Sequence, residues 1–205
     1  MIRVRSRKSV AVLKTGIANT ASVLAAAERS GGDPHLTDDP DEIRRASYVI
    51  LPGVGSFQAA AEALVPDLRT VLLRRIEADR PTLGICLGMQ LFCTGSEESP
   101  EHKGLGIIPR KVTHLQSSPR VPALGWSQVS PKKDCQLLRP GWAYFAHSFA
   151  LHQVPGPWAI AIAGHDQAIA AFEHGNILAC QFHPELSGSY GAQLLDRWLQ
   201  RGAQA

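Results

Sequence analysis

The sequence has no apolar run long enough to cross a membrane. Stretches such as Ala21–Ala27 soon reach Glu28 and Arg29, whereas a spanning helix needs roughly 20 uninterrupted apolar residues. The opening residues, MIRVRSRKS, also lack the apolar segment of a secretory signal. We therefore expect a soluble protein.

A strong excess of charge of either sign is also missing. The chain carries 21 Lys and Arg against 18 Asp and Glu, which gives a formal charge of +3. This is too small for a phosphate-binding face that dominates the chemistry, so nucleic acid is not an expected partner. No CxxC pair occurs among the four cysteines, which favours reduced thiols in the cytoplasm. These are Cys86, Cys93, Cys135 and Cys180.

Nothing in the sequence marks a domain boundary. Of the 205 residues, 44% are hydrophobic, enough for a sizeable core, and no linker, repeat or low-complexity tract divides them. We expect residues 1–205 to form one domain. Residues 1–9, with Arg3, Arg5, Arg7 and Lys8, are predicted to be a basic tail, either solvated or bound to an anion.

The first half alternates short apolar runs with segments of helical period. That pattern predicts βα units and a largely parallel sheet. Asn19 or Thr20 is a candidate cap for the first helix, and Gly31 and Gly32 end it. Strands are expected at 10–13, 35–36, 48–51 and 82–85, and helices at 20–30, 37–46, 56–64, 68–78 and 86–92.

After Gly104 the pattern changes to short strands separated by proline and glycine, which indicates antiparallel additions. The stretches 106–115, 121–129, 143–151 and 158–164 fit such strands. A hairpin is expected from 168–173 and 177–182, and a final helix begins near Ser187. The fold class is therefore α/β.

The segment around Cys86 is predicted to be a nucleophile elbow. An apolar strand runs into Gly84-Ile-Cys86-Leu-Gly88 and becomes a helix, so that the cysteine stands at a sharp turn where small neighbours allow close backbone approach. The helix N-terminus favours thiolate over thiol, and the N–H of Leu87 faces a developing oxyanion. The alternative is a buried structural cysteine. We prefer that reading for Cys93, seven residues later and expected on the same side of the helix.

A candidate general base follows the last strand. Pro184 favours extended backbone at His183, so His183 and Glu185 are expected to project to the same side, with the carboxylate orienting the imidazole. His147 is a second-rank candidate on a predicted strand. The alternative, an ordinary surface histidine, is preferred for His35, His102, His114, His152, His165 and His174.

Two other uses of these segments are a metal site and a phosphate loop. A zinc site from Cys86, Cys93 and His183 lacks the close-spaced ligand pairs that such sites show, and no metal or cofactor is expected. The segment LPGVGS, residues 51–56, lacks the lysine of a phosphate loop. It is either a second oxyanion donor, through Gly53 and Val54, or an ordinary βα turn.

The strings LPGVG, GICLGMQ and FHPE, in that order, resemble class I (triad) glutamine amidotransferases. Further strings (TGIANTASV, GSEES, GLGIIP, GWSQV, YFAHSF and HPELSG) are similar to the glutaminase subunits of imidazole glycerol phosphate synthase, and the match runs from about Val10 to Leu199. The resemblance implies a flavodoxin-like three-layer domain whose central sheet is mixed, mostly parallel, with added antiparallel strands.

The resemblance also implies the chemistry. Cys86 would attack the side-chain carboxamide of glutamine, His183 would transfer the proton to departing ammonia, and Glu185 would hold His183; water would then hydrolyse a glutamyl thioester. The remaining site residues would be the backbone of Leu87, Val54 and Gly53 for the oxyanion and Gln90, Glu98, Ser148 and Phe149 for the substrate.

In this family the partner is a (β/α)8 cyclase subunit, which forms a heterodimer with the glutaminase and uses its ammonia in histidine biosynthesis. Full activity is expected only on assembly, when the loop from Gly53 to Gly55 completes the oxyanion hole. Departures from the family leave a second reading open, namely a paralogue that supplies a nucleotide-sugar amidating enzyme. A non-catalytic scaffold would be expected to have lost part of the triad. The departures are Lys14, Ala123, Leu124, Ser127, Phe149 and Leu186.

Overall fold

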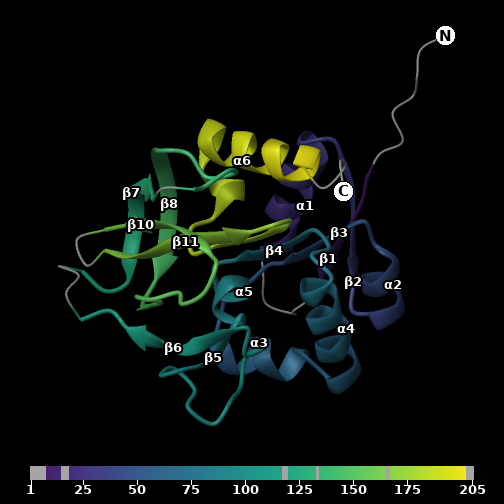
Figure 1. The fold of residues 1–205 in the computed structure, drawn as a ribbon, viewed down its shortest axis with the longest axis horizontal. Coiled ribbons are helices and arrows are strands. Elements are labelled where there is room, and N and C mark those ends of the chain that lie inside the picture. The colour runs from purple at the N-terminus through teal and green to yellow at the C-terminus, as the bar shows by residue number, and fades with distance from the viewer. Residues whose placement is uncertain (1–7, 15–18, 117–119, 133, 165–166, 202–205) are drawn as a thin grey trace.

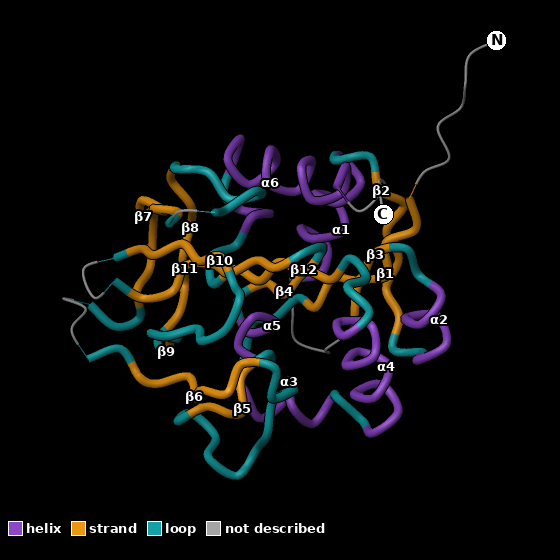
Figure 2. Tube along the Cα trace, in the orientation of Figure 1, coloured by secondary structure: helices purple, strands orange, loops and turns teal. Residues whose placement is uncertain are grey.

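In the computed structural model, residues 8–14, 19–116, 120–132, 134–164 and 167–201 are described. The helices are α1 (Thr20–Arg29), α2 (Pro40–Arg45), α3 (Phe57–Ala63), α4 (Pro66–Glu77), α5 (Leu87–Gln90) and α6 (Gly188–Arg201), with a 3-10 turn at Pro184–Leu186. The strands are β1 (Lys8–Leu13), β2 (Gly32–Thr37), β3 (Tyr48–Leu51), β4 (Thr82–Ile85), β5 (Cys93–Ser96), β6 (Ile108–His114), β7 (Ala123–Pro131), β8 (Gly141–His147), β9 (Phe149–Ala150), β10 (Ala159–Ala163), β11 (Ala168–His174) and β12 (Ile177–Cys180). Figure 2 shows strands forming a central layer between helices.

The central sheet has the order β2-β1-β3-β4-β12-β11-β10-β7-β8. Its first five strands are parallel, and the last four extend it in antiparallel fashion. This confirms the expected α/β fold with added antiparallel strands. A smaller sheet, β5-β6-β9, lies beside it (Figure 1).

Helices cover both faces of the parallel half. In Figure 1, α1 and α6 lie on one side and α3, α4 and α5 on the other. Strand β1 alternates between the two cores, since Val10 and Val12 pack with α1 and α6 whereas Ala11 and Leu13 pack with α2, α3 and α4. A strand buried on both faces gives the continuous apolar run that the sequence shows.

Several boundaries follow the predicted local signals. Asn19 caps α1, accepting a hydrogen bond from the N–H of Ser22, and Gly31 follows the helix with φ of 87°. Arg3, Arg5 and Arg7 lie outside the described residues. Lys8 and Ser9, assigned to the basic tail from the sequence, belong to β1, and the Lys8 ammonium hydrogen-bonds to the carbonyl of Leu199.

Three predicted elements are corrected. The helix expected at 86–92 ends at Gln90, because the carbonyls of Leu91 and Phe92 accept hydrogen bonds from the N–H groups of Leu105 and Ile108. Cys93 therefore begins β5 and is not on that helix. Strand β6 pairs in parallel with β5 as well as antiparallel with β9. The strand expected at 143–151 divides into β8 and β9, which lie in different sheets.

Arg75 on α4 is almost fully buried and has an unusual structural role. Its guanidinium donates to the carbonyls of Ile43, Ala46, Ser47 and Pro81 at 2.8–3.2 Å, and so joins α4 to the end of α2 and the start of β4. Burial, with a smaller contribution from the charge of Arg80, lowers its pKa to about 9.

We expect Arg75→Met to destabilise the fold. The substitution removes all four hydrogen bonds of the buried guanidinium, although the carbonyls of Ala46 and Pro81 keep a second donor in Arg80 and Val49. We expect it to lower the free energy of unfolding by about 3 kcal/mol. Urea denaturation of Arg75→Met and of the matched variant Arg74→Met, which is exposed on the same helix, measures this. If both variants unfold at the same urea concentration, the buried guanidinium is not a structural link.

Candidate active site

Three adjacent parallel strands, β3, β4 and β12, deliver the candidate residues to one edge of the sheet. Residues 53–55 follow β3, Cys86 follows β4, and His183 and Glu185 follow β12. Carboxyl ends of neighbouring parallel strands meet at the same edge, where ligands bind in open α/β sheets. The sheet topology therefore explains how residues nearly a hundred positions apart come together.

Cys86 stands at a strained turn between β4 and α5. Its φ is 51° and its ψ −108°, a conformation that non-glycine residues rarely adopt. The turn fits because its neighbours are small: a Cβ on Gly88 would lie 1.9 Å from the carbonyl oxygen of Leu51, and one on Gly84 would lie 2.8 Å from that of Gly88. This is the geometry of a nucleophile elbow.

His183 and Glu185 form a buried pair. The Nδ1 of His183 lies 2.8 Å from Oε1 of Glu185, and both side chains are nearly inaccessible. A carboxylate only accepts hydrogen bonds, so Nδ1 carries the proton and Nε2 is left for Cys86. His183 is extended, as Pro184 predicts, but residues 184–186 form a 3-10 turn, so the pairing arises from a turn and not from a continuous extended segment.

The electrostatics of the pair favour a charged imidazole. Burial alone would lower the pKa of His183, but hydrogen bonds to Cys86 and Glu185, together with the charges of these groups, outweigh it and raise the pKa to about 10. Such a base holds a proton taken from the thiol. The arrangement thus suits a thiolate–imidazolium pair.

Cys86 and His183 line a pocket of about 340 Å³. That volume suits a small molecule. Gly53 and Glu185 are absent from the lining, and His147, the second-rank candidate, is a pocket residue. The lining residues are Val54, Gly55, Cys86, Leu87, Gln90, Glu98, Pro122, Ala146, His147, Ser148, Phe149 and His183.

The predicted substrate residues already have protein partners on one side. Gln90 donates its amide N–H to the carbonyl of Phe149 at 3.0 Å, which leaves its own carbonyl oxygen as an acceptor. Glu98 accepts the N–H of Phe57 through Oε2 at 3.0 Å. The carbonyl of Ser148 accepts the N–H of Leu115. Each residue is thereby fixed in place at the pocket wall.

The loop after β3 blocks the candidate oxyanion hole. The N–H of Leu87, expected to face the oxyanion, donates instead to the carbonyl of Gly53 at 3.4 Å. Gly55 has φ of 105°, where only glycine is unstrained. A turn of the Gly53–Val54 peptide would remove this carbonyl and present the N–H of Val54.

Cys93, His35 and His102 do not join the site. Cys93 is fully buried in an apolar cluster, and burial raises the pKa of its thiol to about 12, as for a structural cysteine. Among the described residues no cluster of His, Cys, Asp and Glu is arranged to hold a metal ion. His35 and His102 pair at the surface with Glu42 and Glu62, and His165 lies outside the described residues.

Gln181 is a site residue that was not predicted from the sequence. This buried side chain donates its amide N–H to Sγ of Cys86 across 3.5 Å. One sequence feature pointed to it: Gln181 is a single polar residue between the apolar Cys180 and Phe182, two positions before the candidate base His183.

The chain is similar to known proteins along most of its length. The sequence model of the class-I glutamine amidotransferases matches residues 28–200. The subunit HisH of imidazole glycerol phosphate synthase from Zymomonas mobilis is 40% identical over 206 residues, covering 95% of this chain and 97% of that protein. The subunit HisH from Pyrococcus furiosus is 41% identical over 194 residues, covering 91% and 95%.

Solved structures share the fold at low sequence identity. A glutamine amidotransferase matches with a TM-score of 0.77 at 17% identity, covering 95% of this chain and 98% of the other. A chain of PurLQS from Thermotoga maritima matches with a TM-score of 0.74 at 17% identity, covering 95% and 99%. Both HisH relatives are named as subunits of imidazole glycerol phosphate synthase, so they do not support the second reading, a paralogue that supplies a nucleotide-sugar amidating enzyme. The chain belongs to the class-I glutamine amidotransferase family.

Proposed function

We propose that this chain is the glutaminase subunit of an imidazole glycerol phosphate synthase, working in the cytoplasm as one domain spanning residues 1–205. The observation that carries the proposal is the buried His183–Glu185 pair beside Cys86, with Cys86 and His183 lining a pocket of small-molecule size. The names of the HisH relatives indicate the synthase to which such a subunit would belong.

The geometry supports the following reaction. Cys86 gives its proton to Nε2 of His183, and the thiolate attacks the carboxamide carbon of glutamine. Return of that proton to the amino group expels ammonia and leaves a glutamyl thioester. Water then attacks the thioester, with His183 accepting the water proton and restoring the thiol, and glutamate leaves.

Binding of the rest of glutamine is assigned to the pocket wall. The free carbonyl oxygen of Gln90 and the second carboxylate oxygen of Glu98 are acceptors suited to the α-amino group, and backbone of Ser148 and Phe149 flanks the same end. The oxyanion is assigned to the N–H groups of Leu87 and Val54, with Gly53 as the residue that must turn.

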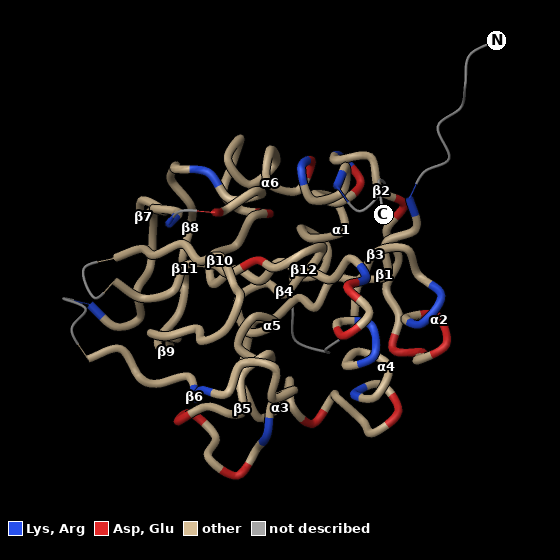
Figure 3. The backbone as a smooth tube through the Cα atoms, viewed as in Figure 1, with Lys and Arg blue, Asp and Glu red and all other residues tan. Residues whose placement is uncertain are grey.

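The partner in this proposal is a (β/α)8 cyclase subunit that takes up the ammonia. The HisH relatives are named as subunits of a synthase. In this chain β7 and β8 carry no charged residue, as Figure 3 shows. Their outer face exposes Leu124, Trp126 and Trp142. Leu186, three residues after the candidate base His183, is also exposed. An uncharged face with large apolar side chains is typical of a protein interface.

We expect the isolated chain to release glutamate slowly and the assembled complex to release it faster. Because the Gly53 carbonyl occupies the Leu87 N–H, forming the oxyanion hole on assembly should raise kcat by about 10²–10³-fold. Glutamate release is measured with and without the cyclase subunit and its nucleotide ligand. An unrelated (β/α)8 protein is the control. Equal rates with and without the cyclase would refute the proposed partner.

A further inference from the structure

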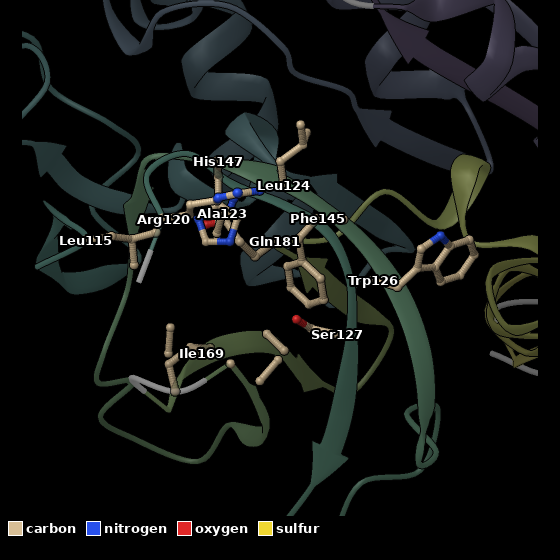
Figure 4. Close-up of a pocket in the computed structure, with 15 residues that line it drawn as sticks. Leu115, Arg120, Ala123, Leu124, Trp126, Ser127, Phe145, His147, Ile169 and Gln181 are labelled. Carbon is tan, nitrogen blue, oxygen red and sulfur yellow. The ribbon is translucent and has the colours of Figure 1, made fainter. Parts of the chain in front are cut away.

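Gln181 contacts the nucleophile but has no part in the reaction described above. It directly follows β12, is 1% exposed, and its backbone N–H is anchored to the carbonyl of Ala170 at 2.8 Å. Its side chain lies between Cys86 and a separate cavity of about 190 Å³, whose wall it shares with Phe145 and His147 (Figure 4).

The orientation of the Gln181 amide is set by a chain of hydrogen bonds. The carbonyl of Phe149 can only accept, so the group of Gln90 that faces it at 3.0 Å must be the NH2. The same NH2 donates to Oε1 of Gln181 at 3.2 Å. The opposite end of the Gln181 amide is therefore its NH2, which faces Sγ of Cys86 at 3.5 Å.

We propose that Gln181 is a positioning residue that holds the sulfur of Cys86 in its thiolate form and links it to the substrate-binding wall through Gln90. A buried thiolate needs hydrogen-bond donors to replace water. Gln181 supplies one without adding a second positive charge beside the His183 imidazolium. This inference rests on the proposed glutaminase function.

Alkylation of Cys86 by iodoacetamide tests the first part without using glutamine. Because the thiolate is the reactive form, loss of one donor to it should move the midpoint of the pH–rate profile upward by about one unit in Gln181→Met. Gln181→Glu, which places an oxygen against the sulfur, should move it further. The matched control is Gln193→Met on the exposed face of α6. Peptide mass spectrometry identifies the alkylated cysteine.

A profile for Gln181→Met that matches the parent chain would overturn the proposal. Gln181→Glu preserves the bond accepted from Gln90, so it provides the same test if the methionine variant does not fold. An unchanged profile in Gln181→Glu would also overturn the proposal.

Steady-state kinetics of the assembled complex test the link to catalysis. We expect Gln181→Met to lower kcat about tenfold with little change in KM, since the lost interaction acts on the reacting sulfur. A rise in KM with an unchanged alkylation profile would mean that Gln181 only supports the pocket wall, and would refute the proposal. If the parent chain shows no glutaminase activity but alkylation still shifts, the proposed function fails while the contact stands.

Discussion

Cys86→Ala is expected to abolish glutamate release while leaving the fold intact. Among the described residues of the site, the Cys86 sulfur is the group placed to form a covalent bond to the substrate. Removal of a nucleophile that acts with its base lowers kcat by at least about 10⁴-fold. The alanine keeps the β4–α5 turn, since the turn depends on Gly84 and Gly88. Glutamate release by the assembled complex measures the effect.

Cys93→Ala is the matched control for this substitution. Cys93 is buried at the start of β5 and packs in the apolar cluster that includes Met89 and Ile108. Removing its sulfur should cost about 1 kcal/mol of stability, with turnover close to that of the parent chain. If Cys86→Ala hydrolysed glutamine as fast as Cys93→Ala, the assignment of the nucleophile would be wrong.

Glu185→Gln is expected to have the next largest effect. A glutamine amide is able to turn its NH2 toward Nδ1 of His183, which forces the ring proton onto Nε2, the nitrogen that must accept from Cys86. By analogy with the carboxylate of other triads, kcat should fall by about 10³-fold or more. The single-turnover rate of thioester formation, compared with that of the parent chain, measures this.

The stability difference between the parent chain and Glu185→Gln should change with pH in a definite direction. His183 has an ordinary pKa of 6.5, raised to about 10 in the fold. A raised pKa contributes stability that is fully present below 6.5 and is lost as pH rises through about 10. Because Glu185 causes part of the increase, the stability advantage of the parent chain over Glu185→Gln should shrink across this interval. An advantage that grows with pH would contradict the assignment.

Much of the site could be predicted from the sequence because local backbone preferences determine the conformation at Cys86 and His183. An apolar run ending in Gly84-Ile-Cys86-Leu-Gly88 leaves few alternatives to a sharp strand-to-helix turn, and the structure has φ of 51° at the cysteine. Pro184 correctly predicted an extended His183. The parallel strands β1, β3 and β4 followed from apolar runs buried on both faces.

The parts that escaped prediction depend on distant segments. The end of α5 at Gln90 is caused by hydrogen bonds from residues 105 and 108, which no local pattern announces. Arg75 looks like an ordinary charge on an amphipathic helix until the carbonyls around it are known. Gln181 acquires a role only when Cys86 and Gln90 are brought to either end of its amide.

The conformation of the loop from Gly53 to Gly55 could not be predicted from the sequence either. Glycine at positions 53 and 55 indicates a loop able to change conformation, but not which conformation it adopts. The hydrogen bond from Leu87 to the Gly53 carbonyl identifies the closed form of the hole. It provides a structural reason for the low activity expected of the chain by itself.

The central claim is that the Cys86 sulfur forms a thioester with glutamine. Acid quenching of the complex during turnover, followed by peptide mass spectrometry, tests it most directly. We predict that the peptide containing Cys86 gains the mass of glutamine less ammonia, and that the adduct disappears in Cys86→Ala. An adduct on another residue, or turnover with no adduct in the parent chain and in the slowed Glu185→Gln variant, would contradict the account.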